Sequence, residues 1–118
     1  MEKKILVYDN QSAYFELLKE IFLNSYEFVL INSNSRLKVD LEYDMVLFFV
    51  YDEIELLDFI KLYIEEIPFV LGISNNAAAK NFTDYGNIQF LNLLKLKDEL
   101  ISDISRLLEE RFSYKKTR

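Results

Sequence analysis

Short apolar runs recur five times along this chain, and longer segments with helical spacing separate them. The runs are rich in Val, Ile, Leu and Phe and span residues 5–8, 28–31, 45–51, 69–73 and 88–94. Runs of this length and composition are typical of strands that are buried on both faces of a sheet. Strands that alternate with helices form parallel sheets with helices on both faces. The alternation therefore predicts an α/β fold with a five-stranded parallel sheet.

Three of the other segments carry apolar residues along one helical face. The first helix should follow Ser12, a candidate N-cap, and the last should begin with acidic residues in its first turn. The middle helix should open with Asp52 and Glu55 as a capping box and continue until Pro68 ends it. The apolar faces of these helices are formed by Tyr14, Leu17, Leu18, Ile21 and Phe22, by Leu56, Leu57, Ile60, Tyr63, Ile64 and Ile67, and by Leu100, Ile101, Ile104, Leu107 and Leu108.

The two remaining connections, at residues 32–43 and 75–87, leave room only for short helices of about two turns, and an irregular connection is the alternative for each. The whole pattern predicts a flavodoxin-like (βα)5 fold, doubly wound, whose second and fourth helices are short. At 118 residues the chain has the size of one domain, which we place at residues 1–112. Residues 113–118, SYKKTR, lack periodicity and are expected to form a basic, solvated tail.

Composition excludes several classes of site. The chain has no Cys and no His, so disulfides, thiolate metal sites, the usual zinc ligand and the usual general base are excluded. Its formal net charge of −6 should repel phosphate backbones, so nucleic acid is not an expected partner. The apolar run near the start has only four residues, far fewer than a signal peptide or a membrane span needs. We therefore expect a cytoplasmic protein that binds no membrane.

Four strand segments carry a resemblance to a known family. They read ILVYDN at 5–10, DMVLFFV at 44–50, IPFVLGIS at 67–74 and GNIQFLNLL at 86–94. In that order they resemble the segments ILVVDDE, DLVLLDI, PVIxLTA and GADDYLTKP of response-regulator receiver domains, the CheY-like family. The register of all four is mutually consistent and covers nearly the whole chain. The resemblance implies a site at the carboxyl ends of the strands.

The positions that carry chemistry in receivers are altered here. Receivers phosphorylate an aspartate at the end of the third strand, and this position falls on Phe49, which has no nucleophilic atom. The acidic pair that holds magnesium falls on Asp9 and Asn10, so the magnesium site should be very weak or absent. The hydroxyl position falls on Ile73 and the lysine position on Leu93. The resemblance thus implies no catalysis, no cofactor and a degenerate receiver pocket at Asp9, Asn10, Phe49, Ile73, Ser74 and Leu93.

Three polar residues near this pocket have both a chemical and a structural interpretation. Asp52 is either a displaced phosphoacceptor or the N-cap of the middle helix, and the capping box favours the cap. Lys95 either replaces the missing lysine or is an exposed loop residue, and its two-residue offset along the strand, about 6–7 Å, favours the loop. Asp9 either binds metal or accepts hydrogen bonds from nearby backbone amides, and we expect the second.

These departures predict a pseudo-receiver that works by binding a protein. With Phe49 buried in the pocket, such a domain would hold one conformation without phosphate. In receivers the fourth helix, fifth strand and fifth helix form the usual output or dimer face. The resemblance places Phe90 on this face, near Lys80, Tyr85 and Lys95, and implies an unidentified protein partner or self-association. Ordinary core or sheet-edge packing is the alternative interpretation of Phe90.

Two other functions stay open. One is a working receiver that accepts phosphate on Asp52. The other is a small flavodoxin-like module that binds a small molecule such as a flavin. The glycine-rich phosphate loop of such modules is absent after the first strand, where residues 9–15 read DNQSAYF.

Overall fold

A five-stranded, all-parallel sheet forms the centre of the protein. The computed structural model describes residues 3–22, 24–35, 39–74 and 88–112. The strands are β1 (Lys3–Tyr8), β2 (Tyr26–Ile31), β3 (Met45–Phe49), β4 (Phe69–Ile73) and β5 (Ile88–Asn92). Their order is β2-β1-β3-β4-β5, and all four neighbouring pairs are parallel. The predicted α/β class and the five-stranded parallel sheet are therefore confirmed.

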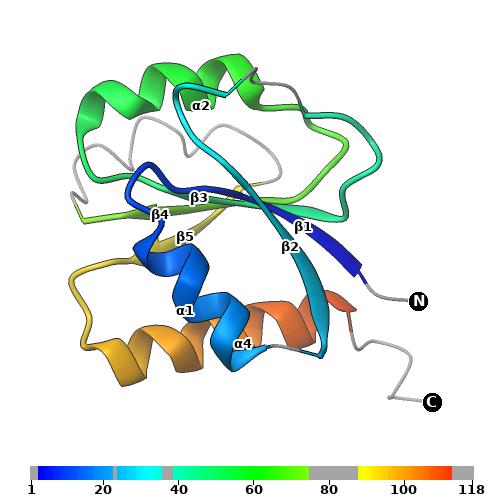
Figure 1. Ribbon diagram of the computed structural model, residues 1–118, viewed down its shortest axis with the longest axis vertical. Helices are drawn as coiled ribbons and strands as arrows, with labels where there is room; N and C mark the ends of the chain where they lie inside the picture. The colour runs from blue at the N-terminus through cyan, green and yellow to red at the C-terminus, as the bar shows by residue number, and fades with distance from the viewer. Residues whose placement is uncertain (1–2, 23, 36–38, 75–87, 113–118) are drawn as a thin grey trace.

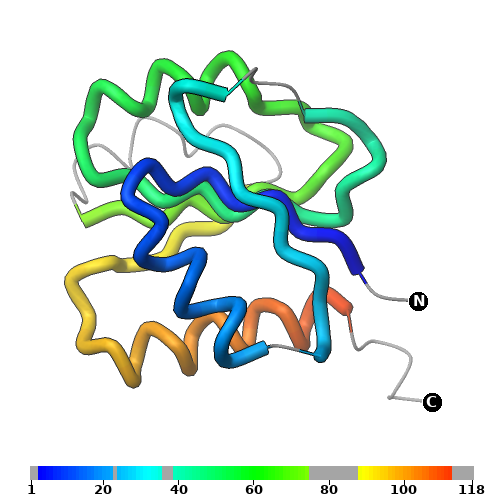
Figure 2. The backbone as a smooth tube through the Cα atoms, viewed as in Figure 1, coloured from blue at the N-terminus to red at the C-terminus, as the bar shows by residue number. Residues whose placement is uncertain are grey.

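The order of the strands creates a switch point between β1 and β3. From β1 the chain passes outward to β2, then returns past β1 to build β3, β4 and β5 on the other side, as the tube from blue to yellow shows (Figure 2). The connections that leave β1 and β3 therefore diverge at the carboxyl ends of these strands. In sheets of this kind, ligands bind in the crevice where this divergence occurs.

Helices cover both faces of the sheet. Helices α1 (Ala13–Ile21) and α4 (Lys97–Phe112) lie together on one face, and α2 (Leu56–Leu62), preceded by the 3-10 helix η1 (Glu53–Glu55), lies on the other (Figure 1). Successive strand residues alternate between the two faces, as the period of two of a strand requires. Leu6, Tyr8, Val46 and Phe48 pack in the cluster on the α2 side, and Ile5, Val7, Met45, Leu47 and Phe49 pack in the cluster on the α1 and α4 side.

The described residues contain three α-helices rather than the five of a complete (βα)5 fold. Within residues 32–35 and 39–44 the predicted short second helix is absent, so this prediction is wrong for that part of the chain. The reason is local, because Asn32 and Asp40 turn their side chains back on the backbone. The Asn32 Oδ1 accepts from the Asn34 amide at 2.9 Å, and the Asp40 Oδ1 accepts from the Glu42 amide at 3.0 Å. Such turns compete with helix formation. The predicted fourth helix, at 75–87, lies outside the described residues.

The middle helix begins as predicted but ends early. The Asp52–Glu55 capping box is present at the start of η1. However, α2 ends at Leu62, and Tyr63 has extended backbone with φ −62° and ψ 129°, so Pro68 is not what ends the helix. The chain leaves the helix to bury Ile67, which is 2% exposed, just before β4 begins. Among the described residues, no helix combines the length and the apolar character that crossing a bilayer requires.

Candidate functional site

Asp9 lies directly after β1 at the switch point and is fully buried. Its Oδ2 accepts a hydrogen bond from the Phe15 amide at 2.9 Å, and its Oδ1 accepts from the Gln11 amide at 3.2 Å. The Tyr51 hydroxyl, which comes from the segment after β3, also donates to Oδ1 at 2.5 Å. Both carboxylate oxygens are therefore used within the protein, and the expected role of Asp9 as an acceptor from backbone amides is confirmed.

Asp9 also takes over the role predicted for Ser12. Ser12 occupies the N-cap position of α1, but its φ of 63° is in the left-handed region and its side chain makes no capping hydrogen bond. The Ser12 amide instead closes a turn onto the Asp9 carbonyl at 3.1 Å. This turn brings the Phe15 amide, in the first turn of α1, to the Asp9 carboxylate. The prediction of a serine cap is wrong, because a buried carboxylate three residues earlier satisfies the helix N-terminus.

Asn10 ties together three segments around the same crevice. Its Oδ1 accepts from the Ser33 amide at 2.7 Å, in the loop after β2. Its Nδ2 donates to Glu55 Oε2 at 2.5 Å and lies 3.3 Å from the Tyr8 hydroxyl. Tyr8 in turn donates to Asp58 Oδ2 at 2.6 Å. The Asn10 side chain thus joins the segment after β1 to the loop after β2 and to η1.

Phe49, which the sequence resemblance aligns with the phosphoacceptor of receivers, lies at the end of β3. Its side chain is fully buried and stacks on Tyr14, with ring centroids 4.4 Å apart and an interplanar angle of 7°. The neighbouring strand makes room for it with Gly72, where an added Cβ would lie 3.0 Å from Phe49 Cδ1 and 3.1 Å from Leu93 Cδ2. Phe49, Leu93 and the α1 side of the core therefore form one apolar cluster.

The other residues singled out from the sequence do not join this cluster. Ile73 is 3% exposed and packs on the opposite face of the sheet, while Ser74 is exposed at the end of β4. Lys95 donates to Asp103 Oδ2 on α4 at 2.7 Å. Asp52 is exposed and accepts from the Ile54 amide at 3.2 Å, so its capping role is confirmed.

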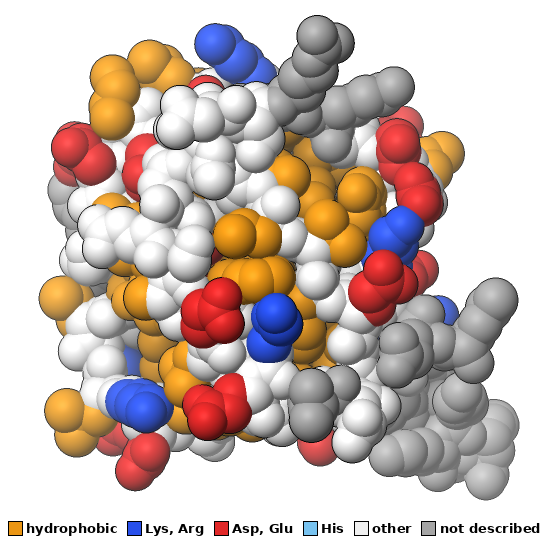
Figure 3. Space-filling model, in the orientation of Figure 1, with side chains coloured by type: hydrophobic (Ala, Val, Ile, Leu, Met, Phe, Trp, Pro, Cys, Tyr) orange, Lys and Arg blue, Asp and Glu red, His pale blue; other side chains and the backbone are white. Residues whose placement is uncertain are grey.

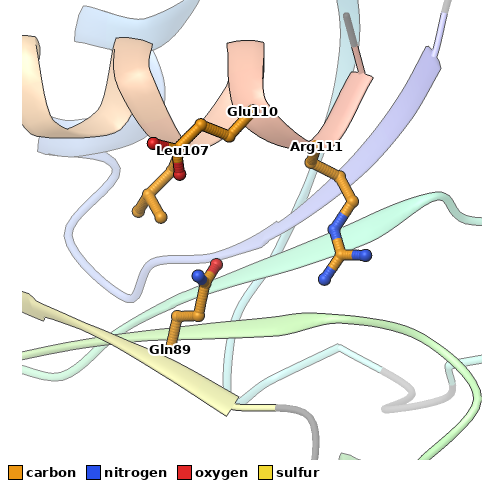
Figure 4. A pocket seen from close by; sticks show the side chains of 4 residues that line it. All are labelled: Gln89, Leu107, Glu110 and Arg111. Carbon is orange, nitrogen blue, oxygen red and sulfur yellow. The ribbon is translucent and has the colours of Figure 1, made fainter. Parts of the chain in front are cut away.

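The proposed interaction face is only partly within the described residues. Phe90 lies on the edge strand β5 and is 38% exposed, so it is not ordinary core. Lys80 and Tyr85 lie outside the described residues. Between β5 and α4 lies a pocket lined by Gln89, Leu107, Glu110 and Arg111 (Figure 4). Gln89 is near the amino end of β5, so this pocket lies away from the strand-end crevice.

Sequence reasoning missed five residues of the crevice. Tyr51, Tyr8 and Glu55 supply the hydrogen bonds that saturate Asp9 and Asn10, and Tyr14 covers Phe49. Asp58 accepts from Tyr8. One signal was available, because Tyr8 lies in an otherwise apolar strand and a buried tyrosine hydroxyl needs a hydrogen-bond partner. The identity of that partner was not visible in the sequence, because it lies on another element.

Burial raises the pKa of Tyr8 and of Tyr51 well above the usual value of 10.0, and the hydrogen bonds to Asp58 and Asp9 raise them further. Unfolding releases both phenols, so the unfolded chain loses these protons near pH 10 while the folded protein keeps them. The stabilisation that these two phenols contribute is therefore fully present below about pH 10 and should be lost as the pH rises above it.

We expect alkaline unfolding with a midpoint above about pH 10, where phenolate absorbance and loss of circular dichroism rise together. The stability of the Tyr51→Phe variant should fall less steeply above about pH 10 than that of the unchanged protein, because one linked proton is removed. Phenolate formation by Tyr8 and Tyr51 in a protein with native circular dichroism would contradict this expectation.

Within the described residues, no group of three or more acidic, His or Cys side chains is placed to hold a metal ion. Comparison of the chain with protein-family models, curated proteins and solved structures returned no match.

Proposed function

We propose that this protein is a phosphorylation-independent, receiver-like module that acts by binding another protein. The observation that carries the proposal is the closed crevice at the end of β1 and β3. The stacked rings of Phe49 and Tyr14 fill it. Both carboxylate oxygens of Asp9 accept hydrogen bonds, from backbone amides and from the Tyr51 hydroxyl. A site that binds magnesium and a phosphoryl group needs open oxygen ligands and a nucleophile.

The strand order adds support to the receiver resemblance. The order β2-β1-β3-β4-β5 is the one that receivers and flavodoxins share, and the four receiver-like segments fall on β1, β3, β4 and β5.

The exposed apolar surface is a second observation that supports the proposal. Eight large hydrophobic side chains of the described residues are exposed, Phe90 among them. Scattered exposed hydrophobics are normal, but those that gather on one element suggest contact with another protein.

A magnesium titration followed by amide NMR tests the proposal. With magnesium and beryllofluoride, a phosphoryl mimic, we expect no saturable shift of the Asp9, Phe49 or Asp52 amides. The reason is that the hydrogen bonds of Asp9 would have to break before its oxygens could coordinate the ion. Saturable shifts at these three residues would mean that the protein is a phosphorylatable switch.

The alternative in which Asp52 accepts phosphate can be tested by measuring the intact mass of the protein. A receiver that used Asp52 would gain a labile addition of about 80 Da after incubation with a small phosphodonor and magnesium. Against it stands the role of Asp52 at the start of η1, where its Oδ1 accepts from the Ile54 amide. A flavin-binding module would be revealed by visible absorbance of the purified protein.

A further inference from the structure

Three exposed apolar side chains gather on the outer side of η1 and α2. Ile54 is 65% exposed, Leu57 is 55% exposed and Ile60 is 51% exposed. Their spacing of three residues places them along one side of this helical segment. In Figure 3, hydrophobic side chains reach the surface at the upper left, over the start of α2, with acidic side chains beside them. We call Ile54, Leu57 and Ile60 the outer stripe.

The opposite side of the same segment already packs on the sheet. Phe59 is fully buried and Leu62 is 3% exposed, and both belong to the core cluster on the α2 side. The ring of Phe59 contacts Phe48 edge-on at 5.3 Å between centroids. The apolar residues of the outer stripe are therefore not needed to hold α2 on the sheet.

Negative charge is concentrated around the outer stripe. Residues 52–66 contain six acidic side chains and one lysine, a net charge of −5 within a chain whose total is −6. Two of the acids, Glu55 and Asp58, accept hydrogen bonds from Asn10 and Tyr8 in the crevice. The other four are exposed, two at the start of η1 and two just after α2, at positions 52, 53, 65 and 66. The outer stripe is thus apolar between two acidic ends.

We propose that the outer stripe is the docking surface for a basic amphipathic helix of a partner protein. This inference rests on the proposed protein-binding function and names both a surface and a partner chemistry for it. Apolar side chains of such a helix would pack between Ile54, Leu57 and Ile60, as ridges pack into grooves. Its lysines and arginines would face the acidic ends and speed association.

The same charges argue against the other occupants. Two copies of the chain would bring together two surfaces that each carry four exposed acids and one lysine, and like charges across an interface oppose association. Nucleic acid and anionic membranes carry negative charge and would be repelled in the same way. The surface near Phe90 is less suited to a basic partner, because its acidic residue Asp103 is already paired with Lys95 and Arg106.

The test uses two synthetic helical peptides of equal length, both with leucine on one face. One carries lysine on the other face, and the second carries glutamate. We expect the lysine peptide to shift the amide NMR signals of η1 and α2 in the full chain, and to bind more weakly as salt rises. The glutamate peptide should not bind.

A matched pair of double variants locates the binding. Leu57→Gln with Ile60→Gln should weaken binding of the lysine peptide at least about tenfold, because interface anchors carry most of the affinity. Leu94→Gln with Leu96→Gln is the control, since these leucines are 70% and 74% exposed on the loop before α4. The control should bind as the unchanged protein does. Well-dispersed amide spectra establish that both variants are folded.

Several results would overturn the inference. These are equal binding of both peptides, shifts confined to β5 or the loop before α4, equal effects of the two double variants, and no binding at about 1 mM peptide. A dimer that the Leu57 and Ile60 changes dissolve would assign the outer stripe to self-association, and binding to anionic vesicles would assign it to a membrane. If the magnesium titration is flat while the peptide fails, only this surface is wrong. If magnesium shifts appear while the peptide binds, only the phosphorylation-independent function is wrong.

Discussion

Phe49→Asp is expected to abolish stable folding at neutral pH. The change removes a fully buried ring that stacks on Tyr14 and packs against Gly72, a loss worth about 3–5 kcal/mol. It also places a carboxylate in a cluster whose described members are all apolar, at a further cost of several kcal/mol. Together these effects reach the total stability of about 5–15 kcal/mol that a domain has. Circular dichroism and urea unfolding measure the loss.

Phe49→Leu is the control, because it keeps an apolar side chain of nearly sufficient size. We expect a loss of about 1–2 kcal/mol and a cooperative unfolding transition. A folded aspartate variant that magnesium stabilises would show instead that the crevice opens to ions. In that case the aspartate would have restored a receiver site beside Asp9, and the interpretation of a closed crevice would fail.

The sheet could be predicted from the sequence because its strands are buried on both faces. A run such as residues 45–49 is apolar at every position, and only a central strand of a covered sheet tolerates this. The helices were less certain. Asn32 and Asp40 form local turns where the sequence left room for a helix, and α2 ends at Leu62 although apolar spacing continues to Ile67. At Asn32 and Asp40, local hydrogen bonds from the side chain to the backbone prevailed over helix formation.

The strand-end position of the crevice could be predicted from the sequence, but the hydrogen-bond partners inside it could not. The sequence resemblance aligned Phe49, Asn10 and Leu93 with chemical groups of receivers, and the structure places each of them at or just beyond the end of its strand. These partners come from distant parts of the chain. Tyr51 reaches Asp9 across 42 residues, and Tyr8 reaches Asp58 across 50. No local pattern encodes such pairs, because each partner is set by how two elements pack.

Asp9→Ala is expected to cost about 3 kcal/mol, because it leaves the buried Phe15 amide and the Tyr51 hydroxyl without an acceptor and removes the cap of α1. A carboxylate kept only to bind metal would behave in the opposite way. Its removal would relieve unpaired buried charge, and alanine would be neutral or stabilising in metal-free buffer. Urea unfolding of the variant in buffer without divalent ions separates the two roles.

Asp52→Ala is the matched control for Asp9→Ala, since Asp52 also accepts from a backbone amide at the start of a helical segment but is exposed. Water can replace its hydrogen bond, so its loss should cost about 1 kcal/mol.

Tyr51→Phe should cost about 1 kcal/mol alone and much less in the Asp9→Ala background, because both changes remove the same hydrogen bond. Equal losses for the two aspartates, or additive losses for Asp9 and Tyr51, would contradict a structural role for Asp9. Coupling between Asp9 and Tyr51 would show that their hydrogen bond holds together the segments that follow β1 and β3.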